Sequence, residues 1–253
     1  MVATIRCARF GGRATLLGET EIVISPVREA ANRRALLFEP GQVANATTRE
    51  AAELAGLTIS ATASREELLH CLETDRPDLI IVSGADQGEP DPLLDEIEAA
   101  RRTEKMPVLF VADEAPRPAG NHANFDWLSP GANLSVMFLA IRALLRRERP
   151  WVLEEVRAGG TLELDEASFR LSDGNRTAPL NKVDLSILGP FFDAPGHVFD
   201  RAMLQRLAYG PRQWKEGSRL IDGGVCKTRR LLKRHLGHDP IQTVRGVGYH
   251  LVS

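Results

Sequence analysis

The sequence contains little cysteine and no long apolar run, and both absences limit what the chain can be. Its 253 residues include three scattered cysteines, Cys7, Cys71 and Cys226, which cannot form a disulfide framework and have no close histidine or cysteine neighbours suggesting zinc. No apolar stretch approaches the roughly 20 residues needed to span a bilayer. The N-terminus also lacks a continuous apolar segment ending in a small-residue cleavage site. We therefore expect a cytoplasmic protein with no membrane association, no bound metal and no cofactor.

Motifs of catalysis are missing as well. The sequence has no glycine-rich phosphate loop, no metal-ligand spacing and no pairing of a nucleophile with a base, so we do not expect an enzyme.

Charge is distributed unevenly between the two halves of the chain. From residue 151 onward there are 15 Lys and Arg against 12 Asp and Glu, a net charge of +3, whereas the first 150 residues carry 17 against 22, a net charge of −5. A basic C-terminal half favours contact with phosphate groups.

The stretch 220–252 predicts a helix, a turn and a closing β-hairpin. An apolar stripe recurs at helical spacing, and Gly237 follows it where a helix needs a residue with positive φ. Strands are predicted at 241–244 and 249–252, joined by residues 245–248. The members of the stripe are Ile221, Val225, Thr228, Leu232 and Leu236.

Basic side chains cover the rest of this helix and the tip of the hairpin. A basic amphipathic helix followed by a hairpin with an arginine at its tip is typical of a winged helix, in which the helix enters the major groove of double-stranded DNA. Lys227, Arg229 and Arg230 are the first candidates, because arginine and lysine can contact guanine and phosphate. The full set of predicted DNA contacts is Arg219, Lys227, Arg229, Arg230, Lys233, Arg234, Thr243 and Arg245.

The runs IDGGVCKTRRLLKR and IQTVRGVGYHLV closely resemble the C-terminal DNA-binding domain of OmpR/PhoB-type response regulators, over residues 158–253. Short strands at 161–164, 169–171 and 178–180 would form its N-terminal platform. Asn181 with Asp184, and Asp200, predict the starts of two helices. In the family the loop before the recognition helix often meets RNA polymerase, which makes Trp214 a candidate contact. A buried anchor of this loop is an equally good interpretation.

Strands and helices alternate through residues 33–148. Apolar strands at 35–39, 57–61, 79–83, 106–112 and 125–129 are separated by helical segments. This alternation predicts a doubly wound parallel sheet. The fold class is therefore α/β plus winged helix, and the order of elements resembles the receiver domain of the same family of two-component regulators.

The resemblance implies a phosphorylation pocket, yet the residues that would form it are absent. Family receivers hold Mg²⁺ with an acidic pair, accept phosphate on an aspartate, and bind the phosphoryl group with Thr or Ser and Lys. The matching positions here are Glu39, Ser83, Ala112 and Ser129. Asp86 or Asp113 could replace the missing acceptor only if displaced from the family position. We predict a degenerate receiver that does not use aspartyl phosphorylation.

The predicted organisation is an N-terminal extension at 1–32, a receiver-like domain at 33–148, a linker at 149–158 and a winged-helix domain at 159–253. The helix that starts at Asn133 carries an apolar stripe that could support a homodimer through the receiver-like domain, or could pack on the sheet. Gly223 and Gly224 interrupt the basic helix. They indicate either a close approach of backbone to DNA or weakened base recognition.

These observations favour a DNA-binding transcriptional regulator of the OmpR/PhoB type that acts without receiver phosphorylation. The alternative is a signalling adaptor that works through protein contacts and retains only nonspecific DNA affinity. A phosphorelay protein with a displaced aspartate is a third hypothesis.

Overall fold

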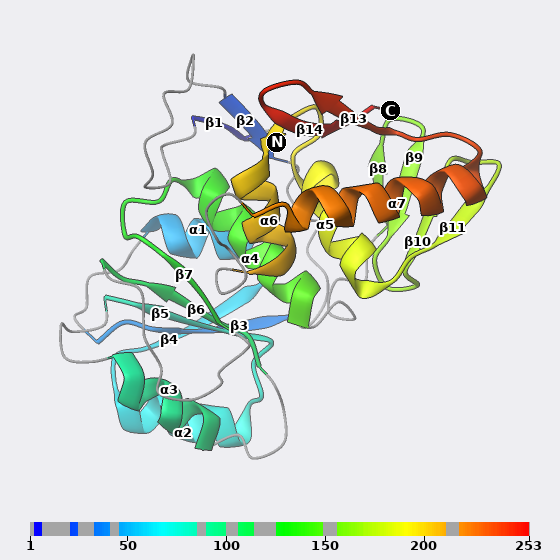
Figure 1. Cartoon of the computed structure of the whole chain (residues 1–253). Coiled ribbons are helices and arrows are strands. Elements are labelled where there is room, and N and C mark those ends of the chain that lie inside the picture. Colours follow the sequence, from blue (N-terminus) through cyan, green and yellow to red (C-terminus); the bar gives the residue numbers. More distant parts are fainter. Residues whose placement is uncertain are drawn as a thin grey trace. The chain divides into compact units, whose positions relative to one another are not determined.

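The computed structural model describes residues 3–6, 21–24, 33–40, 46–84, 90–99, 106–113, 125–148, 156–210 and 218–252. The chain divides into two compact units (Figure 1). The sheet unit lies within residues 27–149, and the C-terminal unit comprises residues 150–253 together with the strands β1 and β2. Each unit is considered by itself below.

The sheet unit contains five parallel strands in the order β4-β3-β5-β6-β7. In this order the chain winds outward in both directions from β3, which is the doubly wound topology expected from the sequence. The strand β5 is buried at every position because a parallel sheet is covered on both faces. The five strands are β3 (Arg34–Phe38), β4 (Thr58–Thr62), β5 (Leu79–Ser83), β6 (Val108–Val111) and β7 (Phe125–Leu128).

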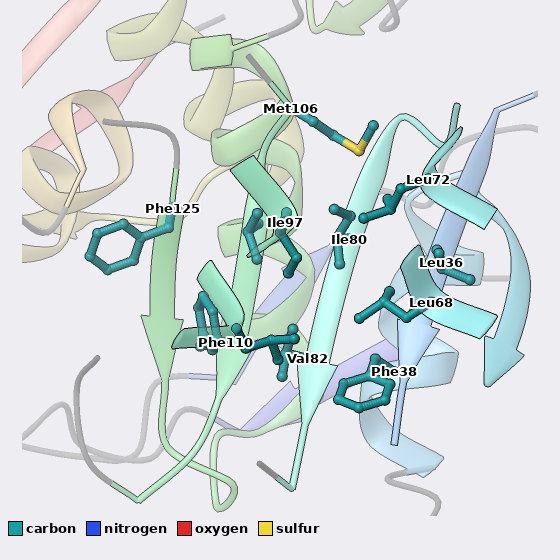
Figure 2. Packing of buried hydrophobic residues seen from close by; sticks show 12 residues of the cluster. Leu36, Phe38, Leu68, Leu72, Ile80, Val82, Ile97, Met106, Phe110 and Phe125 are labelled. Carbon is teal, nitrogen blue, oxygen red and sulfur yellow. The ribbon is translucent and has the colours of Figure 1, made fainter. Parts of the chain in front are cut away.

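Helices cover both faces of this sheet (Figure 1). On one face α1 (Ala46–Leu54) packs along α4 (Leu134–Glu148), and on the other α2 (Arg65–Thr74) packs against α3 (Pro90–Ala99). Figure 2 shows the core on the α2 and α3 side, where alternate residues of the strands meet the apolar stripes of the helices. Its buried members are Leu36, Phe38, Leu68, Leu72, Ile80, Val82, Leu93, Ile97, Met106, Val108, Phe110 and Phe125.

Two details of the sheet unit differ from the sequence prediction. The sequence predicts a helix from Leu93, whereas α3 begins three residues earlier, at Pro90. The run 64–67 predicts a capping box at the N-terminus of α2, and the Ser64 hydroxyl accepts the expected hydrogen bond from the backbone N–H of Glu67. The reciprocal half of the capping box is replaced, because the Ser64 N–H donates to the Thr62 hydroxyl, which in turn donates to the Glu67 carboxylate.

The apolar stripe of α4 is buried. Val136, Leu139, Ala140, Ala143 and Leu144 are each at most 3 % exposed. The helix packs along α1 and also contacts β7. The burial of this stripe therefore supports the interpretation that it packs within the sheet unit.

The C-terminal unit opens with a platform of four antiparallel strands in the order β11-β10-β9-β8. The strands β9 (Leu162–Asp165), β10 (Arg170–Ser172) and β11 (Thr177–Pro179) match the three predicted strands. The fourth strand, β8 (Val156–Gly159), was not predicted. Most of it lies in the segment 149–158 that was assigned to the linker. It pairs with β9, so the platform starts before residue 159.

Three helices and a small sheet follow the platform. The helix α5 (Lys182–Asp193) begins with the predicted capping box of Asn181 and Asp184, and α6 (Arg201–Tyr209) is capped by Asp200. The helix α7 (Leu220–Leu236) then leads into a hairpin whose second strand also pairs with β12 and is therefore the central strand of this sheet. The three strands are β12 (Phe199–Asp200), β13 (Ile241–Val244) and β14 (Gly248–Leu251).

The N-terminal strands form a ladder of their own. β1 (Ala3–Arg6) pairs antiparallel with β2 (Glu21–Ile24). The strand β2 falls within the short strand that the apolar run 22–24 predicts at 20–25, whereas β1 was not predicted. Among the described residues, no helix is both long and apolar enough to cross a membrane.

Candidate nucleic-acid interface

The helix α7 is anchored by the stripe that the sequence predicted. Ile221, Val225, Thr228, Leu232 and Leu236 are its buried residues. At its C-terminus, Gly237 adopts a left-handed conformation with φ of 86°, and its N–H donates to the carbonyl of Lys233. The basic residues of the last turn complement the partial negative charge of this helix end.

One polar contact within the stripe links α7 to α5. The Thr228 hydroxyl donates to Asp184 at 2.7 Å, and both side chains are buried. The other oxygen of Asp184 accepts from the Asn181 N–H at 3.2 Å. The same carboxylate therefore caps α5 and fixes α7 against it, which satisfies a charge that would otherwise be costly to bury.

The opposite side of α7 presents a row of cations. At 100° per residue, Lys227, Arg230 and Arg234 fall within about 60° of one another and face away from the buried stripe. All three are exposed. Among the described residues, none of the three side chains has a hydrogen-bond or ion-pair partner. Arg219 and Lys233 flank this row and are exposed too.

Arg229 does not belong to this row. Its Nε and Nη2 donate to the carbonyl of Ile241 at 3.1 and 2.6 Å, and Nη2 also donates to the Thr243 hydroxyl at 2.9 Å. Nε lies 3.2 Å from a carboxylate oxygen of Asp239. This guanidinium therefore points at the hairpin, although the sequence placed it among the first candidates for DNA contact.

The hairpin is held to α7 by a second set of contacts around Tyr249. Two guanidinium groups lie over its ring, that of Arg201 at 5.3 Å and that of Arg229 at 5.5 Å from the ring centroid. Its hydroxyl hydrogen-bonds Asp222, which also accepts from Arg201 Nε at 3.1 Å. Burial, followed by the hydrogen bond and charge of Asp222, raises the pKa of Tyr249, so the phenol stays protonated.

The tip of the hairpin carries the last predicted cation. Arg245 is exposed and precedes Gly246, whose φ of 76° suits glycine in this tight turn. Gly248, predicted as part of the connection, is the first residue of β14. A Cβ at Gly248 would collide with the backbone of Phe199, so only glycine lets β12 and β14 approach each other here.

The two glycines of α7 have different surroundings. A Cβ added at Gly224 would lie 2.9 Å from Ile187 Cδ1 and closer still to the Tyr209 hydroxyl, so this glycine allows α7 to pack tightly on α5 and α6. A Cβ at Gly223 would meet nothing within 4 Å. Gly223 is exposed and lies in line with Lys227, Arg230 and Arg234. Gly224 is therefore explained by packing within the domain, which the sequence did not reveal.

In the sheet unit, the four predicted pocket positions lie at the carboxyl ends of adjacent strands. Glu39 follows β3, Ser83 ends β5, Ala112 follows β6 and Ser129 follows β7. The register pairs Phe38 with Val82 and Val111 with Leu128, which brings the ends of these strands to nearly the same level. This is the edge at which doubly wound sheets bind ligands.

This edge offers little charge for chemistry. Ser83 is 4 % exposed, and Glu39 lies 3.6 Å from the guanidinium of Arg49 on α1. The carbonyl of Ala112 accepts a 2.8 Å hydrogen bond from the indole of Trp127. Within the described ranges, no group of three or more His, Cys, Asp and Glu side chains could hold a metal ion. Asp113 is described and exposed, whereas Asp86 and Trp214 lie outside the described residues.

The basic helix, the hairpin with a cation at its tip and the antiparallel platform define the C-terminal unit as a winged-helix domain. Residues 175–251 match the family model described as "Transcriptional regulatory protein, C terminal". The phosphate regulon transcriptional regulatory protein PhoB of Rhizobium meliloti is 27% identical over 211 residues, which cover 79% of this chain and 90% of PhoB. The transcriptional regulatory protein CseB of Streptomyces coelicolor is 28% identical over 237 residues, covering 85% and 96%. Residues 175–251 thus match the C-terminal domain of transcriptional regulatory proteins, and the chain as a whole is similar to the regulators PhoB and CseB over most of their length.

Solved structures were compared as well. The response regulator DrrB of Thermotoga maritima, an OmpR/PhoB homologue, aligns with a TM-score of 0.37 and 16% identity over 87% of this chain and 99% of DrrB. The DNA-binding domain of RstA from Klebsiella pneumoniae, in complex with the RstA box, aligns with a TM-score of 0.34 and 22% identity, covering 39% of this chain and 97% of RstA's.

Proposed function

We propose that the C-terminal unit binds double-stranded DNA in a sequence-specific manner, with α7 in the major groove and the β13–β14 hairpin as its wing. The observation that carries this proposal is the row of exposed cations, Lys227, Arg230 and Arg234, opposite the buried stripe of α7. Cations without internal partners are available for phosphate oxygens and guanine edges. Arg245 at the wing tip would add a contact beyond the groove that α7 occupies.

The experiment that tests this proposal is operator selection with protein that has not been incubated with a phosphodonor. Random or genomic fragments are incubated at physiological salt with the full chain and with the variant Lys227→Ala/Arg230→Ala. The variant Arg170→Ala/Lys182→Ala loses the same charge at exposed positions of the platform and α5, and serves as the matched control. We expect a tandem or palindromic motif with wild type and control, and none with the α7 variant. Binding without sequence preference and with a steep salt dependence would instead support the adaptor function.

The second part of the proposal is that the sheet unit does not receive phosphate on an aspartate. Its support is the combination of Ser83, Ala112 and Ser129 at the strand ends and the ion pair that neutralises Glu39. A serine hydroxyl cannot form an acyl phosphate, and no lysine at the end of β7 is available to stabilise one. Incubation with a small-molecule phosphodonor followed by intact-mass analysis tests this. Stoichiometric acyl phosphate within residues 27–149 would contradict it.

The proposal includes a homodimer through the sheet unit and a contact of Trp214 with RNA polymerase, both carried by the family resemblance. Sedimentation over a range of concentrations tests the first, and a sheet unit that stays monomeric contradicts it. Cross-linking from position 214 to polymerase on a selected operator tests the second. Such a regulator would act in the cytoplasm without catalytic activity.

A further inference from the structure

We infer that Arg229 is a positioning residue that sets the wing relative to α7, and that it does so as part of a clamp on Tyr249. The clamp consists of Arg201, Asp222, Arg229, Asp239 and Tyr249. This inference rests on the proposed DNA binding and adds to it, because it separates the cations that touch DNA from those that place them.

The contacts of Arg229 occupy one edge of its guanidinium, and that edge is then not available for a bidentate contact with DNA. Bidentate recognition of guanine or phosphate takes two N–H groups along one edge of the fork. In Arg229 the edge formed by Nε and Nη2 already donates to the carbonyl of Ile241. The same edge reaches the Thr243 hydroxyl and the Asp239 carboxylate. Only 27% of the side chain is exposed.

These partners all belong to the strand β13 or to the turn that leads into it. Asp239 is itself fixed, because its other oxygen accepts a 3.0 Å hydrogen bond from the Ile241 N–H. The carboxylate, the carbonyl and the hydroxyl therefore form a rigid receptor for one planar cation. Lysine, a point charge on a flexible chain, cannot satisfy all three in that geometry.

The Tyr249 ring is also contacted by Arg201 from α6, whose guanidinium lies 5.3 Å from the ring centroid. Arg201 donates to Asp222 in the first turn of α7 and, at 3.4 Å, to the carbonyl of Val247 next to the wing tip. Both guanidinium groups therefore contact the ring, and with their hydrogen bonds they tie the hairpin to α6 and α7. Cation–π contacts of this kind contribute most where the groups are partly desolvated.

The consequence concerns Arg245. The tip of the hairpin has no apolar anchor among the described residues, because Arg245, Gly246 and Val247 are all exposed. The position of Arg245 relative to the row on α7 therefore depends on the clamp. Loss of Arg229 should therefore remove the contribution of Arg245 to DNA binding, although Arg229 itself makes no contact with DNA.

The test is a double-mutant cycle on the full chain with the selected operator. Arg245→Ala is expected to weaken binding of the wild type about 10-fold, within the range for a contacting arginine. In the Arg229→Ala background the same substitution should change binding by less than about twofold, because the two residues act as one unit. Arg230→Ala, introduced into both backgrounds as a control, should have the same effect in each. Additive losses from Arg229→Ala and Arg245→Ala would overturn the inference.

Two further variants separate positioning from direct contact. Arg229→Lys keeps the charge and would restore a phosphate contact, so recovery of wild-type affinity contradicts the clamp. Asp239→Ala leaves Arg229 in place and removes its carboxylate partner together with one negative charge. If Arg229 touched DNA, this variant would bind as tightly as wild type or more tightly, whereas positioning predicts a loss of about 5- to 10-fold. Thermal unfolding of each variant shows whether the domain is folded. If the wild-type protein selects no operator, that result contradicts the proposed function and not the clamp.

Discussion

The two units use charge in opposite ways. On α7 the cations in line with Gly223 are exposed and lack partners among the described residues. At the carboxyl edge of the sheet, Glu39, the carboxylate among the four predicted pocket positions, is paired with Arg49. Groups without internal partners are available to a ligand, and paired or uncharged groups are not. The comparison indicates that the C-terminal unit makes the chemical contacts of this regulator. The sheet unit would then act through its shape and surface.

The largest effect should come from the row on α7. We expect Lys227→Ala/Arg230→Ala to weaken operator binding by about 2–6 kcal/mol, since each contacting cation contributes about 1–3 kcal/mol. The slope of log K against log salt should also fall by up to roughly 1.8, because each phosphate contact contributes about 0.9. Fluorescence anisotropy across a salt series measures both quantities. Arg170→Ala/Lys182→Ala should leave both unchanged, and equal losses in the two variants would remove the distinction between exposed cations at α7 and elsewhere.

At the sheet edge, restoring the acidic residue should damage the unit instead of activating it. Ser83→Asp places a carboxylate at a position that is 4 % exposed, and we expect a loss of about 1–3 kcal/mol in the free energy of unfolding. Ser83→Ala is the control and should stay within about 0.5 kcal/mol of wild type. Denaturant unfolding followed by tryptophan fluorescence, with Trp127 of β7 as the probe within the sheet unit, gives the comparison. A stable Ser83→Asp protein that gains acyl phosphate would show that the edge still supports phosphoryl chemistry.

Much of this contrast could be predicted from the sequence. The stripe of α7, its Gly237 stop, the capping box at Asn181 and the parallel order of β3 to β7 all follow from local patterns, and the structure confirms them. Those features depend on periodicity and on short-range hydrogen bonds, which a single sequence displays directly.

Tertiary contacts could not be predicted in the same way. The sequence does not show that Arg229 turns toward β13, because the carbonyl of Ile241 is twelve residues away and its approach depends on how the hairpin folds back. The strand β8 was missed because VRAG lies beside a proline and a glycine pair and has no alternation of its own. The two glycines of α7 look alike in the sequence and differ only in what surrounds them.

Those glycines provide a test within one helix. We expect Gly224→Ala to destabilise the C-terminal unit by about 1–3 kcal/mol, because its Cβ would crowd Ile187 and Tyr209. Gly223→Ala is the matched substitution and should stabilise the unit by up to about 1 kcal/mol, since alanine favours helix and the space is open. Chemical denaturation of both variants measures the difference. Equal effects of the two substitutions would mean that α7 does not pack on α5 and α6 as described.

The smallest predicted effect is a dependence of stability on pH that belongs to the C-terminal unit. His197 packs edge-on against Phe199 at 4.7 Å between ring centroids, and burial lowers its pKa below the ordinary 6.5, with Asp200 opposing the shift. The unfolded chain then binds the proton more readily than the folded one. The contribution to stability is complete above pH 6.5 and is lost as the pH falls through the lowered pKa.

This window can be separated from that of the carboxylates. Hydrogen bonds to Asp165 and Asp173 lower their pKa below 3.8, so the stability that they contribute is lost only at more acidic pH. Unfolding free energies measured between about pH 7.5 and pH 4.5 therefore report mainly on histidine. His197→Phe removes the titrating group and keeps an apolar ring beside Phe199, so the free energy of unfolding should depend less on pH in this range. His235→Asn, at an exposed position, should leave the pH dependence as in wild type. If His197→Phe retains the full slope, the pH dependence arises elsewhere in the chain, and the sheet unit, which contains His70, becomes the next region to examine.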